Sequence, residues 1–161
     1  MSATGTAVLR VTIGVVFVIH GAHILFGVWG GPGVGAGGLS AASARFDVAG
    51  LSPGYVIAVL AGVIQLGAGL LLTVGLLTRW AAAALLLYVL VIAWAMHLPW
   101  GFFLNWTSAP GRGQGLEYSL VLAAALVCLM TGGGGPLSLE GRRASREASI
   151  LAGRARALRR G

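Results

Sequence analysis

The sequence predicts an all-α membrane protein: a bundle of four transmembrane helices with both termini in the cytoplasm. Of the 161 residues, 57% are apolar and only 9% are charged, whereas soluble domains are about half apolar and a quarter charged. The mean hydropathy is +0.89. Four apolar segments come close to the roughly 20 residues that a membrane helix needs. We place these helices at residues 6–26, 55–77, 80–98 and 117–134.

The first predicted helix, residues 6–26, could also be read as a cleaved signal peptide. A signal peptide begins with basic residues, but the only cation here, Arg10, lies inside the apolar run. His20 and His23 occupy positions where a signal peptide is apolar. These features favour a retained span. Arg10 is expected to extend toward the head groups at the cytoplasmic surface.

The second and third helices, residues 55–77 and 80–98, are separated by the two-residue turn Thr78-Arg79. So short a turn makes them antiparallel neighbours and predicts a compact bundle. Small residues in the middle of the second helix, Gly67-Ala68-Gly69, let helix backbones approach closely. The runs show no alternation of period two, which argues against strands.

The fourth helix, residues 117–134, is short and is expected to tilt or to begin deeper in the membrane. The loop before it, residues 99–116, carries Trp100, Phe102, Phe103 and Trp106. Aromatic residues at this density are typical of a membrane interface, and the alternative is a lid over a site that opens sideways to lipid. In the other long loop, a short amphipathic helix is expected to end near Gly50.

The charge distribution sets the orientation and divides the chain into two parts. A membrane domain at residues 1–140 carries little net charge, and a tail at residues 141–161 holds seven of the eleven arginines. With Arg10 and Arg79 on the same side, the positive-inside rule places both termini in the cytoplasm. Because the basic residues form a tail and not a groove, nucleic acid is not an expected partner.

The tail could lie on the anionic membrane surface, dock on an acidic partner subunit, or be disordered. The membrane surface is favoured because each Arg near it contributes about 1 kcal/mol. The residues predicted to contact the surface are Arg142, Arg143, Arg146, Arg154, Arg156, Arg159 and Arg160.

Ionisable residues inside spans are candidates for function, because burying them in a bilayer is costly. At 1.5 Å per helical residue, His20, His23, His97 and Glu117 fall at one depth near the outer leaflet. Gln65 lies deeper, near the midplane. The alternatives are wetted histidines without a role, a carboxylate that only stabilises a helix N-terminus, and a glutamine that bonds a neighbouring backbone.

This set of residues favours a quinone over a metal or haem. The histidines lack the spacing of a known metal motif, whereas a quinone headgroup needs one or two donors, a proton-handling group and apolar walls. No metal and no covalent cofactor is predicted. The predicted ligand-binding residues are His20, His23, Gln65, His97, Trp100, Glu117 and Tyr118.

Several short motifs, in order along residues 8–140, resemble the DoxX family of small bacterial four-helix membrane proteins. They are Ile19-His20-Gly21 before Leu25-Phe26-Gly27, Val74–Arg79, His97–Phe103, Gly115–Tyr118 and Gly135–Glu140. The resemblance implies a link to sulfur and thiol redox chemistry, because relatives called DoxD belong to a thiosulfate:quinone oxidoreductase. By motif position it carries over to His20, His97 and Glu117.

Two positions depart from the family pattern. Members often have Lys where this chain has Ile24, and Glu where it has Gln65. Both changes remove a charge from the interior of the bundle. They make a binding or structural subunit more credible than charge-dependent chemistry.

We therefore expect a DoxX-like subunit of a quinone-linked redox complex in the bacterial inner membrane. Partner subunits are required, because the chain has a single cysteine and no flavin motif with which to carry electrons. The alternatives are a non-catalytic subunit that anchors a larger complex and a small transporter. The sequence leaves open the substrate, any turnover, and the oligomeric state.

Overall fold

The computed structural model describes residues 2–30 and 36–158, and within these ranges the chain forms helices and no strand. A π-helical turn, Ala93–His97, and a 3-10 turn, Leu98–Trp100, continue the fourth helix. The six α-helices are α1 (Ala3–Phe26), α2 (Leu39–Val48), α3 (Gly54–Val74), α4 (Thr78–Ile92), α5 (Glu117–Gly132) and α6 (Leu139–Leu158).

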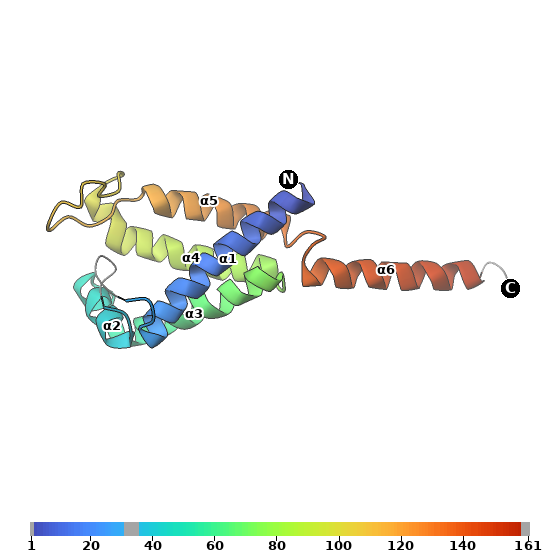
Figure 1. The fold of residues 1–161 in the computed structure, drawn as a ribbon, viewed down its shortest axis with the longest axis horizontal. Coiled ribbons are helices and arrows are strands. Elements are labelled where there is room, and N and C mark those ends of the chain that lie inside the picture. The colour runs from blue at the N-terminus through green and yellow to red at the C-terminus, as the bar shows by residue number, and fades with distance from the viewer. Residues whose placement is uncertain (1, 31–35, 159–161) are drawn as a thin grey trace.

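Helices α1, α3, α4 and α5 run lengthwise and form the bundle (Figure 1). Helix α2 lies at the end where α1 finishes, which we call the loop end. At the opposite end, the terminal end, α1 begins, α5 finishes, and α6 continues outward along the long axis (Figure 1). Helix α1 packs along α3, and α5 packs along α4.

Three helical segments are long and apolar enough to cross a membrane: Ala3–Phe26, Gly54–Val74 and Thr78–Trp100. Helix α5 is also apolar but has only 16 residues, about 24 Å of helix. The hydrocarbon core of a bilayer is about 30 Å thick. An all-helical architecture with three candidate spans is therefore confirmed, whereas the fourth span and the cytoplasmic location of the termini stay predictions.

The predicted turn between the second and third spans is wrong in its position. Thr78 and Arg79 open α4, and the turn lies at residues 75–77. Its left-handed residues are Gly75 and Leu77, with φ of 73° and 50°. A left-handed residue ends a helix by directing its N–H back to the last carbonyls, and the N–H of Gly75 donates to Leu71 and Leu72.

Glycines bring α1 and α3 into backbone contact. A Cβ added at Gly14 would lie 2.8 Å from the carbonyl oxygen of Gly69, and one added at Gly69 would lie 2.9 Å from the carbonyl oxygen of Gly14. Gly21 has no room for a Cβ against the backbone of Leu66. Gly67, by contrast, has nothing within 4 Å. The small residues predicted for this span thus include one that contacts α1 and one that faces away.

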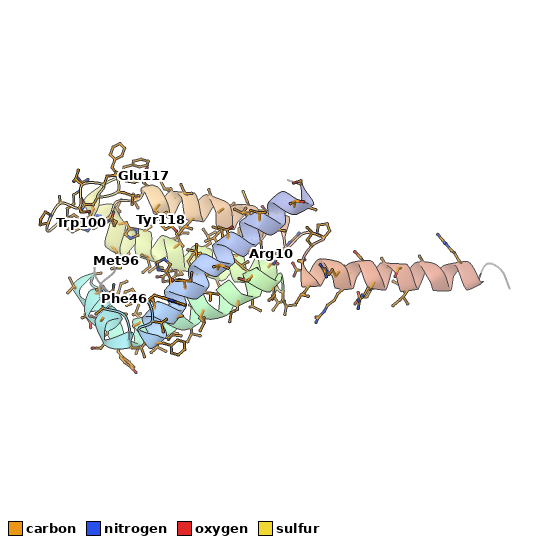
Figure 2. The ribbon with its side chains drawn as sticks, in the orientation of Figure 1. Arg10, Phe46, Met96, Trp100, Glu117 and Tyr118 are labelled. Atoms are coloured by element: carbon orange, nitrogen blue, oxygen red, sulfur yellow. The ribbon has the colours of Figure 1, made fainter. Side chains whose placement is uncertain are left out.

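Arg10 does not extend to a membrane surface, contrary to expectation. Its side chain is only 3% exposed, and Nη1 donates to the carbonyl oxygens of Leu72 and Thr73 at 2.6 and 2.8 Å. These carbonyls lie in the last turn of α3, where few N–H groups of the helix remain as partners, and the N–H of Gly75 is shared between Leu71 and Leu72. A cation at a helix C-terminus is favourable, so Arg10 fixes α1 against the end of α3 (Figure 2).

Glu140 joins the other helix ends at the terminal end. Its carboxylate accepts from the N–H of Thr78 at 3.4 Å and of Gly134 at 3.2 Å. Its own N–H donates to the carbonyl oxygen of Gly75. A carboxylate near the first residues of α4 and α6 complements the positive ends of both helix dipoles.

Helix α2 confirms the short helix expected before Gly50. Phe46 packs in a small core with Ala58 and Ala61 of α3. The Asp47 carboxylate accepts from Ser52 Oγ and from the N–H of Gly54, both at 2.8 Å. These hydrogen bonds hold the pKa of Asp47 below its ordinary value, because they favour the ionised form.

The tail is helical over most of its length, as α6. Arg142, Arg143, Arg146 and Arg156 are exposed on it. Arg159, Arg160 and the side chain of Arg154 lie outside the described part of the structure. The predicted contact of the tail with a membrane surface stays a prediction.

Candidate functional site

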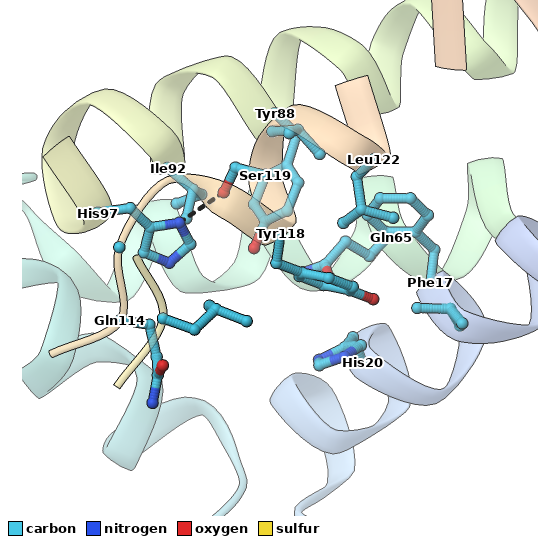
Figure 3. Close-up of a pocket in the computed structure, with 14 residues that line it drawn as sticks. Phe17, His20, Gln65, Tyr88, Ile92, His97, Gln114, Tyr118, Ser119 and Leu122 are labelled. Atoms are coloured by element: carbon cyan, nitrogen blue, oxygen red, sulfur yellow. Dashed lines mark hydrogen bonds between the residues drawn. The ribbon is translucent and has the colours of Figure 1, made fainter. Parts of the chain in front are cut away.

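A cavity of about 470 Å³ opens between α1, α3, α4 and α5 toward the loop end (Figure 3). Four of the residues predicted to bind a ligand line it: His20, Gln65, His97 and Tyr118. The remaining lining residues are Val16, Phe17, Tyr88, Val89, Ile92, Leu104, Gln114, Gly115, Ser119 and Leu122.

His97 reaches the cavity through an irregular helix end. The α-helical part of the span stops at Ile92, and residues 93–97 form a wider π turn. Pro99 follows, whose ring cannot be accommodated inside a regular α-helix. Such π turns are frequent at functional sites. Here the turn carries His97 to α5, where Nδ1 shares a 2.6 Å hydrogen bond with Ser119 Oγ.

Gln65 and His20 approach the cavity from α3 and α1. Gln65 is 3% exposed, and its amide donates to the carbonyl oxygen of Ala61 one turn earlier. This bond is to its own helix, not to a neighbour, so it does not explain why an amide lies in this span. His20 is exposed, and Figure 3 shows it facing Tyr118 across the cavity.

Three predicted residues lie outside this cavity. Nδ1 of His23 lies 2.7 Å from the carbonyl oxygen of Val28. Since a carbonyl oxygen can only accept, Nδ1 carries the proton and donates this hydrogen bond. Glu117 Oε2 accepts from the N–H of Leu104 at 3.3 Å. Trp100 lies beside Gly113 and faces a groove against α2. The single ring of three histidines and Glu117 expected from helix depth is therefore only partly assembled.

The loop at residues 101–116 forms one wall of the cavity through Leu104, Gln114 and Gly115. Glu117 and Asn105 hold this loop. The N–H of Asn105 donates to Gln114 Oε1 at 2.8 Å, and its side-chain amide donates to the carbonyl oxygens of Ala109 and Arg112. The aromatic side chains Phe102, Phe103 and Trp106 are exposed. The loop thus contributes Leu104, Gln114 and Gly115 to the cavity wall, while its aromatic side chains are exposed.

Sequence reasoning missed Ser119, Tyr88 and Gln114. Ser119 is 5% exposed and is the partner of His97. A hydroxyl two residues after Glu117, at the start of an apolar helix, was the available signal for it. Tyr88 packs edge-on against Phe17, with ring centroids 6.5 Å apart. The polar tip of Tyr88 in the middle of an apolar span was a similar signal, whereas Gln114 lies in a loop without a recognisable pattern.

The chemistry of the cavity wall favours a neutral or acceptor-rich ligand. The polar groups are imidazoles, amides and hydroxyls, and no carboxylate is among the lining residues. Within the described ranges, no three His, Cys, Asp or Glu side chains gather as metal ligands. A quinone ring fits this wall, because its carbonyl oxygens need donors and its faces need apolar contacts, here from residues such as Phe17, Ile92 and Leu122.

A family model described as DoxX matches residues 5–98. No curated protein and no solved structure matches the chain. The matched range includes nearly all of α1 and the whole of α2 to α4, and therefore four of the cavity's polar residues, His20, Gln65, Tyr88 and His97.

Proposed function

Because the chain belongs to the DoxX family, we propose that it is a membrane subunit of a quinone-linked redox complex. The family and its three apolar spans make it a multi-pass membrane protein. In this proposal the cavity between α1, α3, α4 and α5 binds a quinone or a similar small redox molecule near the outer leaflet.

The proposed topology has four spans, with α5 as the fourth. Although α5 is short, it packs along α4 and is largely apolar after its first turn. The beginning of α1 and the beginning of α6 lie at the same end of the molecule (Figure 1). The arginines of α6 also extend from this end, so the positive-inside rule assigns it to the cytoplasm of a bacterial inner membrane.

The observation that carries the proposal is that polar side chains from four helices converge on one largely apolar cavity. Its volume, about 470 Å³, is in the usual range for small-molecule sites. In the proposal, the Gln65 amide, the His20 imidazole and the Tyr118 hydroxyl supply hydrogen bonds to ligand oxygens. Ser119 orients His97, whose other ring nitrogen binds a ligand oxygen and can hold or release a proton there.

A bound quinone would supply the exchange of two electrons and two protons. The protein residues would bind it, exclude water with the loop at residues 101–116, and move protons at the imidazoles of His20 and His97. The chain has a single cysteine, Cys128, and that residue is exposed on α5. The electrons therefore come from, or go to, a partner subunit.

The test is to purify the full chain in mild detergent and to measure quinone in its lipid extract by chromatography. We expect stoichiometric quinone in the wild type and a loss of about tenfold in His97→Leu, because a ligand bond to a polarised imidazole is removed. His23→Leu is the matched control, since His23 lies outside the cavity. Quinone at the level of the bulk lipid in the wild type, or equal loss in both variants, would refute the proposal.

A second candidate, a non-catalytic subunit that anchors a larger complex, is favoured by α6. This 20-residue helix extends beyond the bundle (Figure 1). Its arginines Arg142, Arg143 and Arg146 are exposed. Such a helix could dock on an acidic partner. Deletion of residues 141–161 would then release the partner, while His97→Leu would leave the complex intact.

A further inference from the structure

A second hollow, separate from the cavity described above, lies between α2 and the end of the Thr78–Trp100 span. It is a groove of about 500 Å³, which we call the Arg45 groove. Apart from Arg45 and Trp100, the residues that line it have aliphatic or thioether side chains. The lining residues are Ala44, Arg45, Val48, Ala49, Ala95, Met96, Pro99 and Trp100.

A smaller chamber of about 150 Å³ adjoins the groove and shares Arg45 and Met96 with it. Its polar lining comes from His20, His23 and Tyr88, together with Arg45 itself. The side chains of His20, Tyr88 and Arg45 can each donate a hydrogen bond, and no carboxylate lines the chamber. The groove and the chamber thus combine an apolar trough with a compact donor-rich end.

No acidic side chain balances Arg45. The chain has four acids, and each is accounted for elsewhere. Asp47 accepts from Ser52 and Gly54, Glu117 accepts in the loop before α5, Glu140 joins the helix ends at the terminal end, and Glu147 lies on α6. Residues 31–35 contain only Gly, Pro and Val, so they cannot supply an anion.

The Arg45 guanidinium keeps donors available. Of its five N–H groups, two donate to carbonyl oxygens, from Nε to Ala41 and from Nη2 to Ala36, both at 3.2 Å. These two bonds hold the plane of the group against α2. The other N–H groups have no partner among the described residues, and a guanidinium fork matches the oxygens of a phosphate.

We propose that the Arg45 groove binds an anionic phospholipid of the surrounding bilayer, with its phosphate at Arg45 and an acyl chain along the apolar trough. Charge complementarity selects the anion, and the aliphatic lining selects a chain attached to it. The groove also lies at the level expected for lipid head groups, because Trp100, Phe102, Phe103 and Trp106 are exposed at this end and such aromatics mark the membrane interface. This proposal rests on the membrane location and not on a quinone in the cavity.

The experiment is native mass spectrometry of the full chain, titrated with phosphatidylglycerol or with phosphatidylcholine. The wild type should retain phosphatidylglycerol preferentially. Arg45→Gln should weaken its binding about tenfold, because a charge-assisted bidentate contact is lost. Arg112→Gln is the matched control, since this arginine is exposed on the other outer loop and lines neither the groove nor the chamber; it should leave binding unchanged.

Ala95→Phe provides an independent test if Arg45→Gln does not fold. The added ring fills the trough without changing charge, and it should reduce retention of both lipids. Equal retention of the two lipids by the wild type, or unchanged retention in Arg45→Gln, overturns the proposal. If inorganic phosphate binds as tightly as phosphatidylglycerol, the groove recognises only the anion and not the acyl chain, and this result would also overturn the proposal. Quinone measured in the same samples separates this result from the proposed function, because His97→Leu should lose quinone and keep phosphatidylglycerol.

Discussion

Gly21 tests most directly how α1 and α3 position the cavity. A Cβ placed on Gly21 would lie 2.9 Å from both the carbonyl oxygen of Gly62 and the Cα of Leu66. Ordinary van der Waals contact requires about 3.5–4.0 Å, so the helices must separate by roughly 0.6–1.1 Å. The neighbouring atoms belong to the backbone of Gly62 and Leu66, so they cannot move away by a rotamer change.

Overpacking of this kind costs about 1–3 kcal/mol. Gly21→Ala should therefore lower the free energy of unfolding by that amount, and the Tm in detergent by about 2–12 °C. Because His20 is adjacent in the chain and lines the cavity, separation of the helices should also reduce the retention of quinone. Thermal unfolding and lipid extraction of the same preparations measure both effects.

Gly67→Ala is the matched control on α3. This glycine is exposed and has nothing within 4 Å of an added Cβ. Alanine is favoured over glycine in a helix by about 1 kcal/mol, so the Tm should stay the same or rise. If Gly21→Ala is as stable as Gly67→Ala, the backbone contact between α1 and α3 does not hold the bundle together.

Three further predictions concern other parts of the molecule. Arg10→Leu should lower the free energy of unfolding by about 3 kcal/mol or more, because two charge-assisted hydrogen bonds to the end of α3 are lost. Thermal unfolding measures this, with Arg142→Leu at an exposed position as the control. Equal stability of the two variants would contradict the prediction. The pKa of Asp47 is lowered in the folded state by its bonds to a serine hydroxyl and a backbone N–H. Its contribution to stability is therefore complete above its ordinary pKa of 3.8 and disappears as the pH falls through the lower folded-state pKa. The difference in Tm between the wild type and Asp47→Asn should vanish in strong acid, and a constant difference at all pH values would contradict this. Glu117→Gln should leave quinone retention unchanged, whereas Ser119→Ala should lower it about fivefold, because only the serine contacts an imidazole that lines the cavity. Quinone in lipid extracts of both variants measures this difference. A larger loss in Glu117→Gln than in Ser119→Ala would show that the carboxylate, and not the serine, belongs to the site.

Much of the architecture could be predicted from the sequence, because the length of an apolar segment is read directly from consecutive residues. Residues 6–26 and 80–98 were recognisable as spans from their composition, and the helix before Gly50 from its short amphipathic pattern. The turn after the second span was predicted three residues too late, because Leu77 takes a left-handed conformation that its apolar side chain gives no reason to expect.

The candidate site was predictable only in part. Depth along a helix follows from residue number, so His20, His97 and Gln65 could be assigned to the loop end or the middle of the bundle before the structure was known. The direction of a side chain around its helix depends on the neighbours, and this is why His23 and Trp100 were included although they face other hollows.

The sequence by itself determined that this chain is a helical membrane protein, which of its segments are apolar enough to span, and that its basic residues are concentrated in a tail. Those properties are sums over neighbouring residues. Only the tertiary structure decided that Arg10 caps α3 and that Glu117 holds a loop. It also decided that His97 pairs with Ser119 and that Arg45 faces a groove without an acidic partner. Each of these depends on contacts between residues far apart in the chain, whose geometry is set when the helices pack.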